Sequence, residues 1–149
     1  MVTVSQNSIA ILGWGSLLWD NDEKFDGQHG PWFCDGPKIR IEFSRISSTR
    51  KGALTVVIDL KNGQMTEVGY CLSKRAELVD AIKDLEDREE SHRIGFICAK
   101  SGLHCSRYKI IGSSIDKWAK LKSIERVIWT DLESNLSLVN YSQPIDHIC

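Results

Sequence analysis

The side chain best suited to acid–base chemistry in this sequence is Glu89, at the end of a helical pattern. A helix is predicted over residues 73–89, with Ser73 as its N-cap and one apolar stripe along its length. The stripe consists of Leu78, Val79, Ala81, Ile82 and Leu85. Glu89 falls in the middle of this stripe, so a helix that persists to its end directs one carboxylate inward.

Such a position is expected to raise the pKa of Glu89. Burial disfavours the ionised form, and the C-terminus of a helix carries partial negative charge. The neighbouring acids Glu86, Asp87 and Glu90 add repulsion. A carboxyl group with a raised pKa can exchange protons near neutral pH. If the helix ends by Asp87, these acids are only solvated, and periodicity alone does not decide between the two interpretations.

A second stretch with chemical potential is Gly13-Trp14-Gly15-Ser16, which interrupts an apolar run predicted to be a buried strand. The two glycines allow positive φ and a close approach of the backbone to a ligand. Successive N–H groups of such a turn can form an anion site if a helical turn starts at Ser16. The alternative is an ordinary glycine-rich bend. The dinucleotide fingerprint is absent, because Leu18 takes the place of its third glycine.

Taken together, the two stretches resemble the γ-glutamylcyclotransferase superfamily, which includes the ChaC-type enzymes. Residues 13–19, Gly-Trp-Gly-Ser-Leu-Leu-Trp, are similar to its Tyr-Gly-Ser-Asn/Leu-Leu opening. Residues 85–89, Leu-Glu-Asp-Arg-Glu, are similar to a helix end of the form Leu-x-x-Arg-Glu, whose last Glu is the catalytic acid/base. The resemblance implies that Glu89 has this role. It also implies that the turn formed by Trp14, Gly15, Ser16 and Leu17 binds the γ-glutamyl group through its backbone.

The activity implied by the resemblance is cyclisation of a γ-glutamyl amide or peptide to 5-oxoproline with release of an amine. The substrate is a small molecule, and no cofactor or metal is expected. Arg45, near the end of a predicted strand, either binds a substrate carboxylate or faces solvent. The alternatives are a non-catalytic protein of the same fold that binds a carboxylate ligand, and another acyl- or amide-transfer enzyme that uses the same Glu.

The sequence departs from the family pattern at three places. Trp14 replaces the usual Tyr and so lacks its hydroxyl group, and Glu90 replaces a frequent Gly. The Tyr expected shortly downstream is absent from residues 90–96, where His92 or Arg93 is the available substitute. These departures bear on the identity of the leaving group more than on ring closure.

The predicted fold is one α+β domain over residues 1–149, a small and mostly antiparallel β-barrel with flanking helices. Three strands at 38–48, 54–60 and 65–72 are separated by short turns, which favours an antiparallel meander joined to the first strand. Further along the chain the pattern predicts strands at 94–99 and 108–111, a helix at 114–121 and a buried apolar run at 127–129.

Composition narrows the classes of function. The 149 residues carry 19 basic and 20 acidic side chains and a net charge of −1, so nucleic acid is not expected as the main partner. No signal peptide or membrane-spanning run is found, which favours a cytoplasmic protein away from the membrane, with a homodimer left open. The five cysteines are expected to be reduced. Cys98, His104 and Cys105 match no zinc spacing, so no metal site is predicted.

Overall fold

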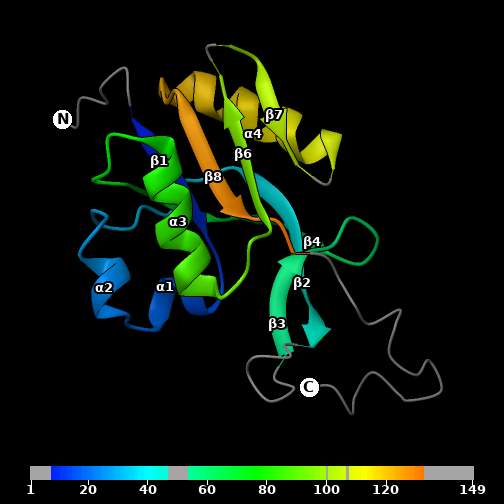
Figure 1. Cartoon of the computed structure of the whole chain (residues 1–149). Coiled ribbons are helices and arrows are strands. Elements are labelled where there is room, and N and C mark those ends of the chain that lie inside the picture. Colours follow the sequence, from blue (N-terminus) through cyan, green and yellow to red (C-terminus); the bar gives the residue numbers. More distant parts are fainter. Residues whose placement is uncertain (1–7, 47–53, 100, 107, 133–149) are drawn as a thin grey trace.

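The computed structural model describes residues 8–46, 54–99, 101–106 and 108–132, which form two β-sheets and four helices (Figure 1). The strands are β1 (Ile9–Gly13), β2 (Lys38–Ile46), β3 (Leu54–Ile58), β4 (Gln64–Glu67), β5 (Gly69–Leu72), β6 (Ile94–Cys98), β7 (Leu103–Cys105) and β8 (Arg126–Thr130). The helices are α1 (Ser16–Trp19), α2 (Glu23–Asp26), α3 (Leu78–Glu89) and α4 (Lys109–Lys122). The α+β class predicted from the sequence is confirmed.

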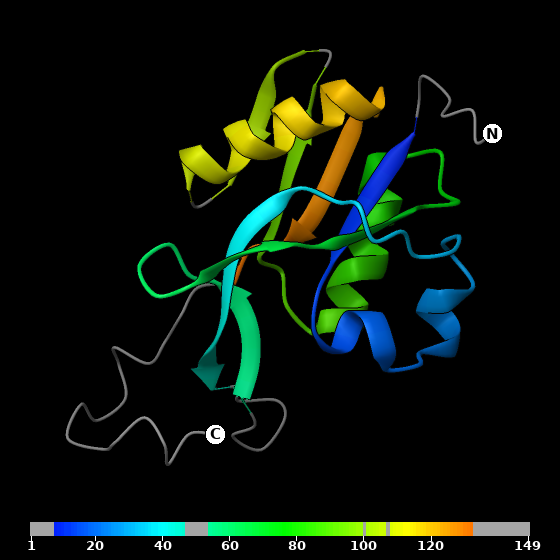
Figure 2. The same cartoon turned by 180° about the vertical axis from the view of Figure 1, so that it is seen from behind.

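The larger sheet has the order β5–β1–β8–β6–β7 and a helix on each face (Figures 1 and 2). All five residues of β1 are buried, because its side chains alternate between two apolar clusters. Ile9 and Ile11 pack in the cluster that contains the buried face of α3. Ala10 and Leu12 pack in the cluster that contains the buried face of α4. The sheet therefore fixes where the turn after β1 and the end of α3 lie.

The expected closed barrel is wrong for the part of the chain that the structure describes. The strand predicted at 65–72 is divided at Val68, whose N–H donates to Pro37 O and whose carbonyl accepts from Gly36 N. As a result β4 pairs with β2 in the small sheet, whereas β5 pairs with β1 in the large one. The meander order is also wrong, because β2 lies between β3 and β4. The sheets are mostly antiparallel, and β1 and β8 form a parallel pair.

Helix α3 begins later than predicted and ends where predicted. Its first residue is Leu78, because Ser73 accepts a hydrogen bond from Arg75 N within a preceding turn. Val79 is exposed and does not belong to the buried stripe. The helix runs to Glu89, after which Glu90 has a φ of 52° and ends it in the left-handed conformation. The interpretation in which these acids follow a shorter helix is therefore excluded.

Two other segments differ from the prediction. The strand predicted at 108–111 is instead the first turn of α4, where Ile111, Ile115 and Ala119 recur every four residues and are buried. Helix α2 lies in a stretch for which no helix was predicted, and its N-cap Asp22 accepts a hydrogen bond from Phe25 N at 3.0 Å. Even α4, with 14 residues, is shorter than the roughly 20 needed to cross a bilayer, and none of the described helices is long and apolar enough to do so.

Candidate functional site

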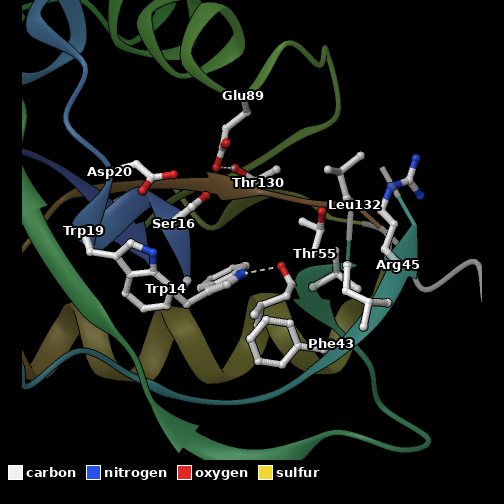
Figure 3. A pocket seen from close by; sticks show the side chains of 14 residues that line it. Trp14, Ser16, Trp19, Asp20, Phe43, Arg45, Thr55, Glu89, Thr130 and Leu132 are labelled. Atoms are coloured by element: carbon white, nitrogen blue, oxygen red, sulfur yellow. Dashed lines mark hydrogen bonds between the residues drawn. The ribbon is translucent and has the colours of Figure 1, made fainter. Parts of the chain in front are cut away.

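A pocket of about 280 Å³ brings the two sequence motifs together (Figure 3). It lies between the turn after β1, the C-terminal end of α3 and the paired strands β2 and β3. Five of the predicted site residues line it, namely Trp14, Gly15, Ser16, Arg45 and Glu89. The two stretches, residues 13–19 and 85–89, are far apart in the sequence and border one cavity.

Leu17 is the predicted site residue that does not line this pocket. Its side chain is buried in the cluster that contains Phe25 and the α3 face of β1. It anchors α1 to the core, so a contact with a ligand in the pocket would have to come from its backbone. The side chains of Ser16 and Leu17 therefore have different surroundings although they are neighbours.

The turn before α1 requires both of its glycines. Gly15 has a φ of 62°, which side chains disfavour, and α1 starts at the next residue as the anion-site hypothesis demands. A Cβ on Gly13 would lie 2.6 Å from Cζ3 of Trp32, so only glycine lets that indole pack here. Trp32 packs against the core cluster that contains Leu17 and Phe25, and it does not line the pocket.

Trp14 is held rigidly at the edge of the pocket. Its Nε1 donates a hydrogen bond to Val56 O at 3.0 Å, which ties the turn to strand β3. The indole thus satisfies its polar group on the protein and leaves ring surface for the pocket. Trp14 cannot provide the hydroxyl of the Tyr that usually stands in this motif.

Glu89 lies at the opposite side of the pocket and is mostly buried. Its side chain is 17% exposed, and Thr130 Oγ1 donates a hydrogen bond to its Oε1 at 3.3 Å. The guanidinium of Arg88 approaches its Oε2 to 3.8 Å and stabilises its negative charge. This attraction opposes the effects of burial and of the helix C-terminus, which the sequence alone suggested. The carboxylate is therefore oriented by two neighbours and still borders the cavity.

Arg88 does not line the pocket, but it contacts three residues that do, and the sequence reasoning missed it. Its side chain is only 6% exposed, and Nη2 donates to Ser16 O at 3.2 Å and to Asp20 O at 3.5 Å. Its Nε lies 4.0 Å from Asp22 Oδ2. Arg88 therefore joins the α1 turn to the end of α3. A helical wheel places it about 20° from Ala81 at about 100° per residue, so its inward position was readable from periodicity.

The remaining lining residues had no such signal. Thr130 is the last residue of β8, Asp20 follows α1, and Phe43 lies on β2. Their places depend on how strands and turns from distant parts of the chain pair. A local pattern does not contain that information.

Other candidates from the sequence lie outside the pocket. His92 is exposed and binds Glu86 with a 2.9 Å contact from its Nδ1, so it does not replace the missing Tyr in this cavity. Burial raises the pKa of the Cys71 thiol, which disfavours a nucleophilic role. The side chain of His104 lies outside the described residues, and no group of three metal-ligating side chains occurs among those described.

Comparison of the chain with protein-family models, with curated proteins and with solved structures finds no match. The case for a function therefore depends on the residues around this pocket.

Proposed function

We propose that this protein is a γ-glutamylcyclotransferase-like enzyme that converts a γ-glutamyl amide or peptide to 5-oxoproline and an amine. Within this proposal its fold is a variant of that superfamily with two open sheets. The observation that carries the proposal is the shared pocket: Glu89 and the Trp14–Ser16 turn border one cavity although they are distant in sequence. Two motifs that resemble one family thus meet in the way a common substrate requires.

In the proposed reaction the α-amine nitrogen of the glutamyl group attacks its own γ-carbonyl carbon. A bond forms between these atoms, and the amide bond between that carbon and the leaving nitrogen breaks. Two protons leave the attacking nitrogen, which begins as an ammonium group, and both end on the leaving amine. Glu89 accepts and returns them in turn and is unchanged at the end. Because nucleophile and electrophile belong to one molecule, holding the folded rotamer provides much of the acceleration.

The turn supplies the binding of the glutamyl head in this scheme. The first N–H groups of a helix have no carbonyl four residues earlier in the helix to pair with. In the proposal, the N–H groups of residues 14–17 hold the substrate α-carboxylate or the oxyanion that develops at the γ-carbonyl. The negative charge of Asp20, which also lines the pocket, favours the α-ammonium group.

The test is release of 5-oxoproline from a panel of γ-glutamyl amino acids, glutathione and γ-glutamyl amines. Glu89→Gln should lower turnover by about 10²–10⁴-fold, the usual contribution of a general acid/base. Glu86→Gln is the matched control, because Glu86 lies on the same helix and does not line the pocket. Unchanged turnover in Glu89→Gln would refute the catalytic assignment.

The panel also separates the alternatives. Wild-type protein that binds γ-glutamyl compounds in calorimetry without releasing 5-oxoproline would favour a carboxylate-binding protein. Release of a different product, with the same dependence on Glu89, would indicate another acyl- or amide-transfer reaction. If no member of the panel binds and none is turned over, the proposal is overturned.

A further inference from the structure

The pocket carries large apolar side chains that the acid–base chemistry does not use. Trp19 on α1 is 65% exposed and Phe43 on β2 is 52% exposed, and both line the cavity. In Figure 3, Trp19, Trp14 and Phe43 follow one another along the side that faces Glu89. We call these three residues the aromatic wall. Exposed aromatic rings gathered at one cavity indicate a surface that a ligand covers.

The rings of the aromatic wall come from separate elements, and a hydrogen bond holds the central one in place. The hydrogen bond from Trp14 Nε1 to Val56 O fixes the central ring. Other exposed apolar side chains, such as Val79 on α3 and Leu121 on α4, do not line the pocket. The gathering is therefore specific to the candidate site.

The charged side chains of the cavity favour different parts of the proposed substrate at its two ends. Glu89 and Asp20 lie toward one end of Figure 3, which suits the ammonium of a glutamyl head. Toward the other end lie Phe43, Leu132 and Arg45. A cationic leaving group is disfavoured there by Arg45, whereas an apolar group gains contact with the ring of Phe43.

We propose that the leaving amine of the substrate carries a large apolar, preferably aromatic, group that packs on the aromatic wall. This inference rests on the proposed function, because it identifies the leaving half of the same substrate. Two chemical sources provide such a group: the γ-glutamyl amide of an aromatic amine and a γ-glutamyl aromatic amino acid. They differ in a carboxylate, which Arg45 recognises in the second case.

The experiment compares kcat/KM for 5-oxoproline release from γ-glutamyl-phenethylamine, γ-glutamyl-phenylalanine, γ-glutamyl-ethylamine and γ-glutamyl-putrescine. We expect the two aromatic substrates to be preferred by at least about 10-fold, the discrimination that a few apolar contacts provide. Phe43→Ala should remove most of this preference, measured as the ratio of kcat/KM for γ-glutamyl-phenethylamine to kcat/KM for γ-glutamyl-ethylamine. The Phe43 side chain is largely exposed, so this variant should fold. Val79→Ala is the matched control for loss of an exposed apolar side chain outside the pocket.

Arg45→Gln distinguishes the two sources. If the substrate is the amino acid, this variant should lower kcat/KM for γ-glutamyl-phenylalanine and not for γ-glutamyl-phenethylamine. If the substrate is the aromatic amide, wild type should prefer γ-glutamyl-phenethylamine to γ-glutamyl-phenylalanine. Arg45→Gln should then reduce neither this preference nor the preference for γ-glutamyl-phenethylamine over γ-glutamyl-ethylamine.

Failure of this inference and failure of the proposed function give different results. Turnover without an aromatic preference, or with a preference for γ-glutamyl-putrescine, would overturn the inference that an aromatic leaving group packs on the aromatic wall. The proposed cyclotransferase activity would still stand. Calorimetric binding of γ-glutamyl-phenethylamine that depends on Phe43, without turnover, would support the wall and overturn the activity. No binding and no turnover would overturn both.

Discussion

At the scale of single residues, the candidate site depends on how Arg88 and Thr130 hold one carboxylate. Thr130 donates to one oxygen of Glu89, and Arg88 approaches the other while donating to the carbonyls of Ser16 and Asp20. Hydrogen bonds to charged groups contribute more than neutral ones, and a buried arginine fork imposes geometry. Arg88 thus contacts both Glu89, the proposed general acid/base, and the turn before α1.

We expect Arg88→Lys to weaken substrate binding more than the chemical step. Nη2 of Arg88 bonds the two carbonyls while Nη1 and Nε approach Glu89 and Asp22. Lysine has one nitrogen and cannot keep all of these contacts, so the turn is held less firmly against α3. KM for the best substrate of the panel should rise about 10-fold with a smaller fall in kcat, and the free energy of unfolding should fall by about 1–2 kcal/mol.

Arg75→Lys is the control for Arg88→Lys. Neither arginine lines the pocket, but Arg75 bonds Asp84 of α3 in a bidentate contact, whereas Arg88 bonds the pocket residues Ser16 and Asp20. Arg75→Lys should cost stability without raising KM. Equal effects of the two variants on KM would mean that Arg88 has only a structural role.

At the scale of elements, the end of α3 contains backbone strain. Glu90 has a φ of 52° at the C-cap, a conformation that glycine adopts without steric cost. This is also the position at which the resembling family frequently has Gly.

We expect Glu90→Gly to raise the free energy of unfolding by about 0.5–1 kcal/mol, measured by urea denaturation, because glycine relieves the left-handed strain. Glu90→Ala should produce no such gain, since alanine keeps the strain. If both variants stabilise equally, the gain comes instead from removing a negative charge at the helix C-terminus.

An ion pair connects the segment before β2 to α4. Lys122 Nζ donates a hydrogen bond to the Asp35 carboxylate, and Trp118 Nε1 donates to Asp35 O at 3.0 Å. The hydrogen bond from Lys122 lowers the pKa of Asp35. A carboxylate with a lowered folded pKa stabilises the fold above its unfolded pKa, and this contribution is lost as pH falls through the folded pKa.

Asp35→Asn should therefore lower Tm by a small amount at pH 7, because the pair is exposed. The difference from wild type should shrink as the pH falls below about 4, the ordinary pKa of an aspartate. Thermal melts by circular dichroism across this range provide the measurement. A difference that stays constant with pH would show that the charge of Asp35 contributes nothing.

At the scale of the whole molecule, the two sheets share one core. Ile39 and Ile58 of the small sheet belong to the same buried cluster as Ile97 and Trp129 of the large sheet. Helix α4 contributes Ile111, Ile115 and Ala119 to this cluster. The described residues of the two sheets therefore share one packed cluster, and a single domain over residues 1–149 stays a prediction.

We expect one cooperative unfolding transition, with coincident curves from near- and far-ultraviolet circular dichroism. Ile58→Ala and Ile97→Ala should each lower the free energy of unfolding by about 2–5 kcal/mol and shift that same transition, because both side chains are fully buried. Two transitions, each moved by only one of the variants, would contradict the single-domain prediction.

The sequence by itself determined the parts that depend on local pattern. The buried strand that ends at Gly13 follows from residue type and spacing. A helical turn at Ser16 and a helix that ends at Glu89 with its carboxylate inward were each one of two alternatives that the sequence left open, and the structure has both. Hydrophobic periodicity and the backbone freedom of glycine act over a few residues, so they can be recognised in the sequence without the tertiary structure.

Only the tertiary structure decided how strands pair and which side chains share the pocket. It divided the predicted strand at Val68 between two sheets and replaced the barrel. It also joined Arg88 to Ser16 across 72 positions and Thr130 to Glu89 across 41. The physical reason is that pairing and burial balance contacts over the whole chain, so a short segment with one pattern can satisfy several arrangements.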